Sequence, residues 1–361
     1  EMLRSLVGSE MCIRDRDYAA LVDDAAAQGI TRIFTSLHIP EANRSRLRHE
    51  VKTVFSEAAD RDMDIIADIS PETQDLLGID AITPQAFDNA HIRTVRFDYG
   101  FDMRKIALFS QVMQVQLNAS TLTPDYLKDL HHYGARFDHI EGMHNFYPRP
   151  NTGLDENYFI SQNKFLADEG IKVGAFIPSQ SGRRGPLFEG LPTLECHRHA
   201  SISLAARHML ALGVSFLCIG DSFPSHEELV TLGTIGKEDK NCVIVAMHVH
   251  TRDPFLYDLL TASFTARCDP ARDAIRAAEG RAYTRDHSIR PDETGRRPRH
   301  IGDITVDNDL FKRYKGEVQI ILRELPPETR TNIIASIVPK ERFLLDYITP
   351  GRPFRLYSVR K

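Results

Sequence analysis

The sequence lacks tryptophan altogether and has only five cysteines among its 361 residues. The cysteines are Cys12, Cys196, Cys218, Cys242 and Cys268. They form no CxxC pair and are odd in number, which argues against a zinc ribbon and a disulfide framework, so we expect a reducing cytoplasm. His248 and His250 share one face of a strand, but no companion ligands follow the other strands, and we expect no metal and no other cofactor.

Long apolar runs and an excess of positive charge are also missing. No apolar segment is long enough to span a bilayer, and the first residues have no continuous apolar core of a secretory signal. The formal net charge of -5 gives no electrostatic reason to expect nucleic acid. A hydrophobic fraction of 42% and a charged fraction of 26% are typical of a soluble globular protein, and 361 residues suffice for two domains.

Residues 1–16 do not resemble the start of a domain. The stretch SEMCIRDR, residues 9–16, resembles translated sequencing-adapter sequence. We therefore expect that residues 1–16 stand in place of the native N-terminus, and we leave them out of the fold prediction.

From residue 17 onward, apolar β-rich segments alternate with segments of helical spacing. Strands are predicted at 31–39, 64–69, 94–99, 115–119, 137–143, 171–177 and 215–219, with helices between them and a long helix over 193–212. Helical crossovers between buried strands indicate a parallel sheet. Seven such strands preceded by a helix predict an α/β fold, a (β/α)8 TIM barrel over 17–238 whose first strand is missing or replaced. A doubly wound open sheet is the alternative, which is weakened because no glycine-rich phosphate loop follows a first strand.

Residues 239–361 are predicted to form a second, smaller domain rich in β-strands. Strand-like segments occur at 242–249, 304–306, 317–322, 331–338 and 354–359, and turn residues concentrate at 287–302. We expect this domain to be a structural appendage or a dimer surface. Loops that close over the barrel mouth are the alternative.

Polar side chains follow most of the predicted strands, where a TIM barrel carries its chemistry. They are Asp68, Asp98, Asn118, Ser120, His144, Asn145, Ser179 and Asp221. Helix N-caps explain Asp68 and Asp221 equally well, whereas residues 99–101 separate Asp98 from the next helix. The segment HNFYPRP, residues 144–150, adds Tyr147 and Arg149 next to the stiffening prolines Pro148 and Pro150. It predicts an active-site rim or, alternatively, a proline-rich turn.

A second polar segment, SQSGRRG at residues 179–185, combines hydroxyls, glycines, Arg183 and Arg184. Bidentate arginine together with backbone N–H groups predicts a phosphate site, and a solvated basic loop is the alternative. Thr193 is predicted to be an N-cap, which puts Glu195 in a first helical turn where the dipole favours the ionised carboxylate. Glu195 is therefore a better base, nucleophile or arginine partner than proton donor, and Glu189 has no such constraint.

Several of these segments together resemble a known family. They are RIFTSLHIPE (32–41), ADISP (67–71), FDYGF (97–101), LNAST (117–121), HNFYPRPNTGL (144–154), RGPLFEGLPTLECHR (184–198), IGDS (219–222) and GDITVDN (302–308) with RYKGEVQI (313–320). On these motifs the chain resembles the MupG-like TIM-barrel family, which is characterised as 6-phospho-N-acetylmuramidase. The resemblance implies a glycosidase-like barrel, a cyclophilin-like C-terminal domain, and cytoplasmic hydrolysis of the β-1,4 bond in a 6-phosphorylated MurNAc–GlcNAc disaccharide during cell-wall recycling. In the family, a first strand precedes the segment that begins at residue 17.

This chemistry assigns expected roles to the residues above. Glycoside hydrolysis needs two carboxyl groups that flank the bond, and we expect Asp98 as the acid with Glu195 as its partner and Asp68 and Asp221 as further candidates. Substrate contacts are expected from Asn118, Ser120, His144, Asn145, Tyr147, Arg149, Ser179, Arg183, Arg184, Glu189, His197 and Arg198. Without tryptophan, a sugar platform must use Tyr, Phe or His. A non-catalytic phosphosugar-binding protein and a phosphosugar lyase or isomerase on the same barrel stay open, as do monomer and homodimer, and no nucleic-acid or membrane partner is expected.

Overall fold

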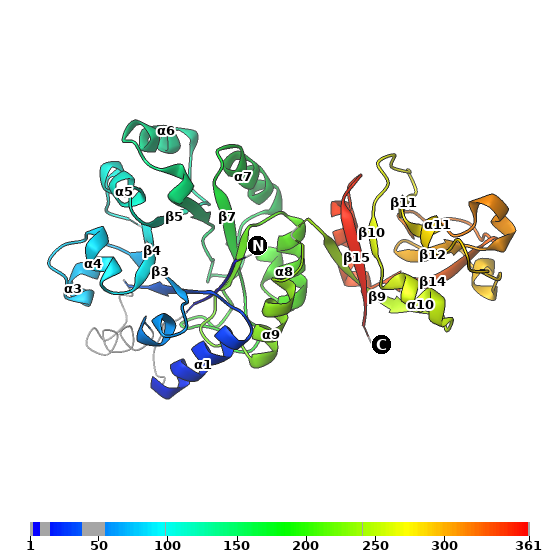
Figure 1. Ribbon diagram of the computed structural model, residues 1–361, viewed down its shortest axis with the longest axis horizontal. Helices are drawn as coiled ribbons and strands as arrows, with labels where there is room; N and C mark the ends of the chain where they lie inside the picture. The colour runs from blue at the N-terminus through cyan, green and yellow to red at the C-terminus, as the bar shows by residue number, and fades with distance from the viewer. Residues whose placement is uncertain (1–2, 8–14, 38–54, 98, 240, 360–361) are drawn as a thin grey trace. The chain divides into compact units, whose positions relative to one another are not determined.

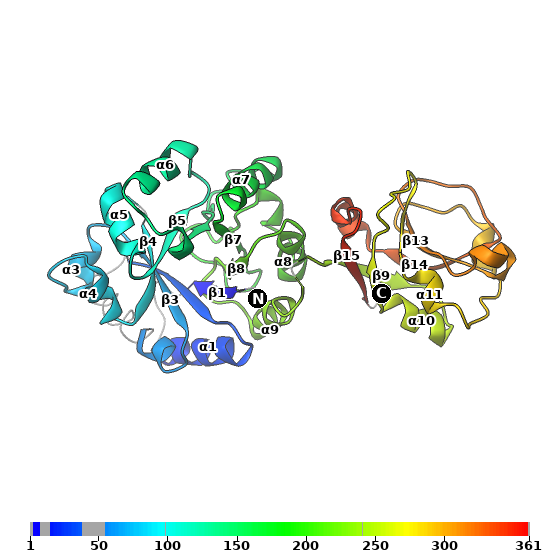
Figure 2. The same cartoon turned by 45° about the horizontal axis from the view of Figure 1, so that its top comes forward.

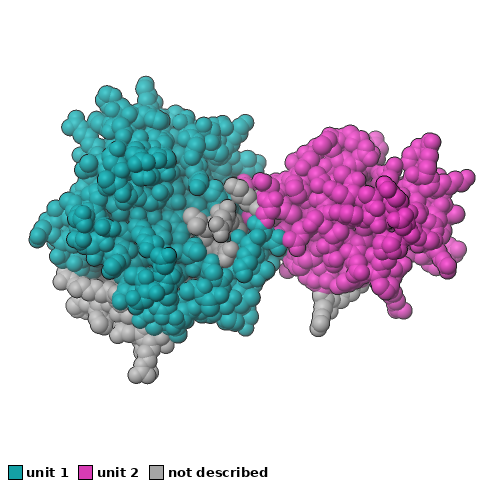
Figure 3. All heavy atoms as spheres, viewed as in Figure 1, with its two compact units in different colours: residues 1–209, 214–238 teal, residues 210–213, 239–361 magenta. Residues whose placement is uncertain are grey.

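The computed structural model describes all residues except 1–2, 8–14, 38–54, 98, 240 and 360–361. It divides into two compact units, which Figure 3 colours separately. Residues 1–209 and 214–238 form the first unit, and residues 210–213 and 239–361 form the second. Among the helices of the described residues, none is both long and apolar enough to cross a membrane.

The first unit is a closed barrel of parallel strands that follow one another in chain order (Figures 1 and 2). The strands are β1 (Leu3–Val7), β2 (Arg32–Ser36), β3 (Asp64–Ile69), β4 (Ile92–Phe97), β5 (Gln114–Asn118), β6 (Ile140–Met143), β7 (Lys172–Ile177) and β8 (Phe216–Ile219). The helices outside them are α1 (Asp15–Ala27), α3 (Thr73–Leu77), α4 (Pro84–Asp88), α5 (Met103–Ser110), α6 (Pro124–His132), α7 (Glu156–Asp168), α8 (Ile202–Ala211) and α9 (His226–Ile235). The TIM-barrel prediction is confirmed, and closure excludes the open sheet.

The first-strand position is filled by Leu3–Val7, which belongs to the segment expected to stand in place of the native N-terminus. Strand β1 pairs with β2 on one side and with β8 on the other, both in parallel register. A short strand at this position pairs with both of its neighbours, and this closes the barrel without a free strand edge. The helix expected between the predicted strands at 31–39 and 64–69 falls largely within residues 38–54, outside the described part of the chain.

The barrel helices begin at residues whose side chains satisfy free backbone N–H groups. Asp102, Thr123 and Asp155 accept such bonds at the starts of α5, α6 and α7. Ser225 and Glu228 form a reciprocal capping box at the start of α9. Since each cap follows a strand, these side chains also fix where the loops at the carboxyl end of the barrel stop.

The helix predicted over 193–212 is wrong in its first half. A short 3-10 turn, η2 (Glu195–His197), precedes α8, and Thr193 is not its N-cap. The Thr193 hydroxyl donates to the Asn145 carbonyl oxygen (2.9 Å) and accepts from the Phe176 backbone N–H (2.9 Å). This tertiary use of the hydroxyl overrides the local preference for a cap.

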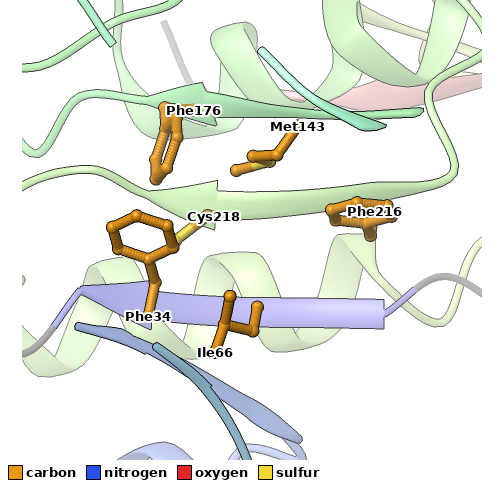
Figure 4. Close-up of a cluster of buried hydrophobic side chains, with 6 residues drawn as sticks. All are labelled: Phe34, Ile66, Met143, Phe176, Phe216 and Cys218. Carbon is orange, nitrogen blue, oxygen red and sulfur yellow. The ribbon is translucent and has the colours of Figure 1, made fainter. Parts of the chain in front are cut away.

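The barrel interior is filled by side chains from five strands. Phe34, Ile66, Met143, Phe176, Phe216 and Cys218 form one buried cluster, which Figure 4 shows between the strands. Because strand side chains alternate between faces, residues two positions beyond these also point inward, toward the carboxyl end. The positions two residues beyond the cluster therefore form the floor of the barrel mouth.

At the opposite end, the interior is closed by buried charges. Arg32 is 3% exposed and binds Asp64 (2.8 Å) and Glu141 (2.7 Å) through its guanidinium. Gln116 donates to Glu141 from the next strand (2.8 Å). Buried charges persist when they are paired and hydrogen-bonded, so this network ties together β2, β3, β5 and β6 away from the mouth.

The second unit is built on a seven-stranded sheet of order β10-β15-β9-β14-β12-β13-β11. Its strands are β9 (Val243–Val249), β10 (Ser263–Thr265), β11 (Ala274–Arg276), β12 (Asp303–Asp307), β13 (Val318–Ile321), β14 (Thr331–Ile337) and β15 (Pro353–Ser358). Its helices are α10 (Pro254–Leu260) and α11 (Gly280–Tyr283), with 3-10 turns η3 (Glu293–Arg296), η4 (Asp309–Tyr314) and η5 (Pro339–Tyr347). All five predicted strands occur. Strands β10 and β11 were missed because three residues are too short to show a period.

Candidate active site

A layer of polar side chains lies directly above the apolar barrel interior. Asp68 lies two residues after Ile66, and Asn145 lies two residues after Met143, so both follow inward-pointing positions. Arg96 is in register with Asp68 on the neighbouring strand, and Asn118 is in register with Met143. The sequence therefore brings Asp68 and Asn145 together as predicted, with Arg96 between them.

Arg96 is a site residue that the sequence reading missed. It is 2% exposed, its guanidinium lies 3.8 Å from Asp68 Oδ1, and its Nη2 donates to Asn145 Oδ1. Among the described residues its Nε has no hydrogen-bond partner. The available signal was the two-residue spacing between Arg96 and Asp98, because Asp98 was expected to face the mouth and strand positions two apart share a face. Asp98 itself lies outside the described residues.

A second guanidinium stands over the same interior. Phe34, Phe176 and Phe146 form a continuous row of edge-to-face rings, with centroids 5.3 and 5.0 Å apart. Arg96 lies 5.5 Å from the Phe34 centroid, and Arg184 lies 5.7 Å from the Phe146 centroid. Two cations thus lie against an aromatic floor at the carboxyl end of the barrel, where an anion would meet them.

His144 points away from the mouth. It is 0% exposed and packs against Phe159 of α7, with centroids 4.5 Å apart. Its Nδ1 contacts Ser120 Oγ (3.0 Å) and its Nε2 contacts Asn163 Oδ1 (2.8 Å). Burial lowers the His144 pKa to about 4, so the imidazole is neutral and joins β5, β6 and α7.

The side chains of Ser120 and Asn118 accept hydrogen bonds from the backbone of the loops that follow β5 and β6. Ser120 Oγ accepts from the Asn145 backbone N–H (3.1 Å), and Asn118 Oδ1 accepts from the Ser120 backbone N–H (3.0 Å). Together with His144 these contacts orient Asn145 toward Arg96. Asn145 reaches the arginine directly, since its side-chain oxygen accepts the hydrogen bond from Arg96 Nη2.

Glu195 and Arg198 form a bidentate ion pair beneath two loops. Arg198 Nε and Nη2 each lie 2.7 Å from a Glu195 oxygen. The Glu195 oxygens also accept from the backbone N–H groups of Asn151 (2.9 Å) and Gly153 (2.7 Å). The Arg198 hydrogen bond is the largest cause that lowers the Glu195 pKa, to about 2. Every Glu195 oxygen is therefore committed to holding the chain.

Arg198 fastens both family-like motifs through backbone carbonyls. It is 2% exposed and donates to the carbonyl oxygens of Tyr147 (3.0 Å), Arg149 (3.1 Å) and Gly190 (3.1 Å). It also reaches the Glu189 carbonyl oxygen (3.4 Å). Tyr147 and Arg149 are thus positioned by their backbones, and the Arg149 side chain is exposed.

The loop after β7 is organised by two buried acids. Asp221 is 0% exposed and accepts from the backbone N–H groups of Ser179 (2.8 Å), Arg184 (2.9 Å) and Leu191 (3.3 Å). Burial raises the Asp221 pKa, while these hydrogen bonds oppose that shift. Glu228 accepts from the Ser179 hydroxyl (2.7 Å), so Ser179 also serves the loop.

The same loop presents the remaining candidates. Arg183 donates to Gln180 Oε1 (2.6 Å) and to the Arg198 carbonyl oxygen (3.1 Å). Gly190, at a φ of +78°, packs against Pro178 at the end of β7, where an added Cβ would lie 3.1 Å from it. Glu189 precedes this glycine and is half-buried. Within the described chain, no hydrogen bond or ion pair engages its carboxylate. His197 is buried and contacts His208 rather than the mouth.

Two family models match the chain. The model described as 6-phospho-N-acetylmuramidase, N-terminal, matches residues 14–234, and the corresponding C-terminal model matches residues 246–357. No curated protein matches in a sequence comparison.

Two solved structures are similar over nearly the whole chain. An uncharacterised Bacillus cereus protein is 28% identical, with a TM-score of 0.86 and 99% of each chain covered. A conserved Enterococcus faecalis protein of unknown function is 29% identical, with a TM-score of 0.73, 99% of this chain and 96% of that chain covered. The two family models between them cover the barrel and the second unit, and each of the two solved structures covers both units. The chain belongs to the 6-phospho-N-acetylmuramidase family.

Proposed function

We propose that this chain is a cytoplasmic glycoside hydrolase that cleaves the β-1,4 bond of 6-phosphorylated MurNAc–GlcNAc in peptidoglycan recycling. Membership of the family supports the reaction class. The observation that carries the substrate is the pair of guanidinium groups, Arg96 and Arg184, over the aromatic floor of the mouth. The phosphate and the lactyl carboxylate of this sugar are both anionic, and guanidinium groups bind such groups through charge-assisted hydrogen bonds.

The arginines differ in how firmly they are fixed. Arg96 is held between Asp68 and Asn145, so it offers a preorganised charge at the floor. Arg184 stands on Phe146 and belongs to the loop that Asp221 organises through backbone N–H groups. A fixed cation and a loop-borne cation can hold two anionic groups of one sugar at different heights in the mouth.

The catalytic acids are proposed from the carboxyl groups at the ends of the barrel strands and in the loop after β7. Hydrolysis requires one carboxylic acid that protonates the leaving oxygen and one carboxylate that acts as nucleophile or activates water. We assign these roles among Asp68, Asp98 and Glu189. Glu195 and Asp221 are positioning residues in this proposal, because their oxygens already accept backbone N–H groups and, for Glu195, a guanidinium.

Phe188 is proposed as the sugar platform. Its side chain is 64% exposed beside Glu189, at a φ of +55° that non-glycine residues seldom adopt. An exposed ring on a rigid loop suits stacking on a pyranose face. The second unit, which the family resemblance suggests is cyclophilin-like, is proposed to act as a structural appendage or a dimer surface.

The test is product analysis with MurNAc 6-phosphate–GlcNAc and with its unphosphorylated form. We expect release of MurNAc 6-phosphate and GlcNAc by the wild-type chain. Arg184→Gln should lower kcat/KM for the phosphorylated substrate by roughly 10- to 150-fold, since a hydrogen bond to a charged group contributes about 1.5–3 kcal/mol. The unphosphorylated substrate should be affected less.

Arg136→Gln is the matched control, because Arg136 pairs with Asp138 at the surface and should leave turnover unchanged. Tight binding of the disaccharide without turnover would contradict the hydrolase proposal and favour a binding protein. An unsaturated or lactate-eliminated product would instead assign a lyase.

A further inference from the structure

Three metal-ligating side chains meet between η2 and α8, in a cluster that the proposed hydrolysis does not use. They are Cys196, His197 and His208, and one ligand atom from each lies within 4.8 Å of the other two. His197 and His208 are 2% and 1% exposed, whereas Cys196 is reachable from the surface. The cluster therefore has two buried imidazoles and a thiol that a solvent ion can approach.

The two rings are held as neutral ligands. His197 Nε2 and His208 Nδ1 lie 2.9 Å apart, so only one of these nitrogens carries a proton. His208 Nε2 lies 3.5 Å from Glu156 Oε2, which favours the proton on that nitrogen and leaves Nδ1 bare. Neutral imidazole is the form that binds metal.

This proton placement leaves a lone pair without a partner. If His197 donates through Nε2 to His208, its Nδ1 is bare. That nitrogen is buried and has no hydrogen-bond partner in the described part of the chain. An unpartnered buried polar atom costs about 1–3 kcal/mol, so a fold that keeps one calls for an explanation.

Glu156 supplies the outer contact that metal-binding histidines usually have. A ligating imidazole almost always donates its second N–H to a carboxylate or carbonyl, which fixes the tautomer and the ring orientation. The contact between His208 Nε2 and Glu156 has this arrangement, with Glu156 on α7 and His208 on α8. The cluster thus contains a thiol, two imidazoles and a second-sphere carboxylate from three elements.

We propose that Cys196, His197 and His208 bind one divalent cation of the zinc class, with Glu156 orienting His208. The cation takes the Cys196 sulfur, His208 Nδ1 and one nitrogen of His197. The thiol proton leaves to solvent, the hydrogen bond between the two rings is broken, the His197 proton stays on the ring nitrogen that does not bind the cation, and water completes the coordination. Zinc ligands at about 2.0 Å for nitrogen and 2.3 Å for sulfur lie roughly 3.3–3.5 Å from one another, so atoms already within 4.8 Å need small movements. The bound ion joins η2 to α8 next to the Glu195–Arg198 pair.

The experiment titrates the chelator-treated, full-length chain with Zn²⁺ by calorimetry and with Co²⁺ by absorption. We expect one saturable equivalent and a thiolate-to-cobalt charge-transfer band. Cys196→Ser should abolish the band and weaken Zn²⁺ binding at least about 10-fold. Glu156→Gln should keep the band and weaken binding by roughly 10- to 100-fold, as second-sphere substitutions do.

Cys268→Ser is the matched control, since Cys268 is also exposed and free but lies in the second unit. It should change neither the band nor the affinity. The absence of saturable binding, or a Cys196→Ser chain that binds as tightly as the wild type, would overturn the site. His208→Asn is a second probe of the site and should also weaken binding. If this buried substitution prevents folding, the result for Cys196→Ser decides.

Discussion

At the scale of single residues, the acids near the mouth differ in the partners they already hold. Glu195 accepts two backbone N–H groups and a guanidinium, and Asp221 accepts three backbone N–H groups. Glu189 holds no such partner within the described residues. An acid that must exchange a proton with substrate is better served by an uncommitted carboxylate, because proton transfer then breaks no structural bond.

Glu189→Gln should therefore reduce kcat with little change in KM. The expected loss is roughly 100- to 10,000-fold, the contribution of a general acid or base. Steady-state kinetics on the phosphorylated disaccharide measure it, with Glu169→Gln as a control at an exposed position beyond α7. A Glu189→Gln chain within a few-fold of wild type would remove Glu189 from the catalytic pair.

His144 makes the stability of the barrel depend on pH. Its pKa is about 4 in the fold against 6.5 for the free group, so the unfolded chain binds the extra proton first as the pH falls. As the pH falls from 6.5 toward 4, the free energy of unfolding of the barrel should therefore decrease, by up to about 1.4 kcal/mol per pH unit. His144→Gln should flatten this slope in denaturant unfolding at several pH values, and an unchanged slope would assign the dependence elsewhere.

At the scale of elements, the sequence predicted the strands better than the loops. Buried apolar runs such as those of β3 and β7 indicate strands of a parallel sheet, and seven of them alternating with helices favoured a barrel over an open sheet. Thr193 and Glu195 were predicted to start a helix because local pattern favours a cap, but their side chains bond to residues about 17 to 48 positions away. Arg96 was missed because an arginine inside a strand is recognised from its two-residue spacing to Asp98 and not from a motif of its own.

The Glu195–Arg198 pair should stabilise the HNFYPRP loop. Glu195→Gln places an NH₂ group among donors, so we expect the barrel to lose about 1.5–3 kcal/mol of unfolding free energy. Proteolysis should quicken at residues 149–153, whose backbone the carboxylate holds. Thermal unfolding and limited proteolysis measure the two effects. Equal protection of both chains would show that the loop does not depend on this carboxylate.

At the scale of the whole molecule, His144 of the barrel and Asp307 of the second unit are buried titrating groups of opposite kind. The barrel buries the neutral imidazole of His144, whereas the second unit buries Asp307 of β12 at 7% exposure. Burial and the nearby Glu317 raise the Asp307 pKa to about 7. Glu317 is itself paired with Arg281, so its charge stays close to Asp307. The two units should therefore respond to pH in opposite directions.

Between pH 3.8, the pKa of the free group, and about pH 7, Asp307 keeps its proton in the folded second unit, whereas the unfolded chain has already released it. Its stability should therefore fall as the pH rises through this window, by up to about 1.4 kcal/mol per unit, while the barrel gains stability. Asp307→Asn keeps an oxygen that can accept from the Thr331 hydroxyl (3.2 Å) and removes the titration. Calorimetry at several pH values should show two transitions that move in opposite directions, of which Asp307→Asn flattens only the one that falls. If both transitions moved together, burial of Asp307 would not control the stability of its unit.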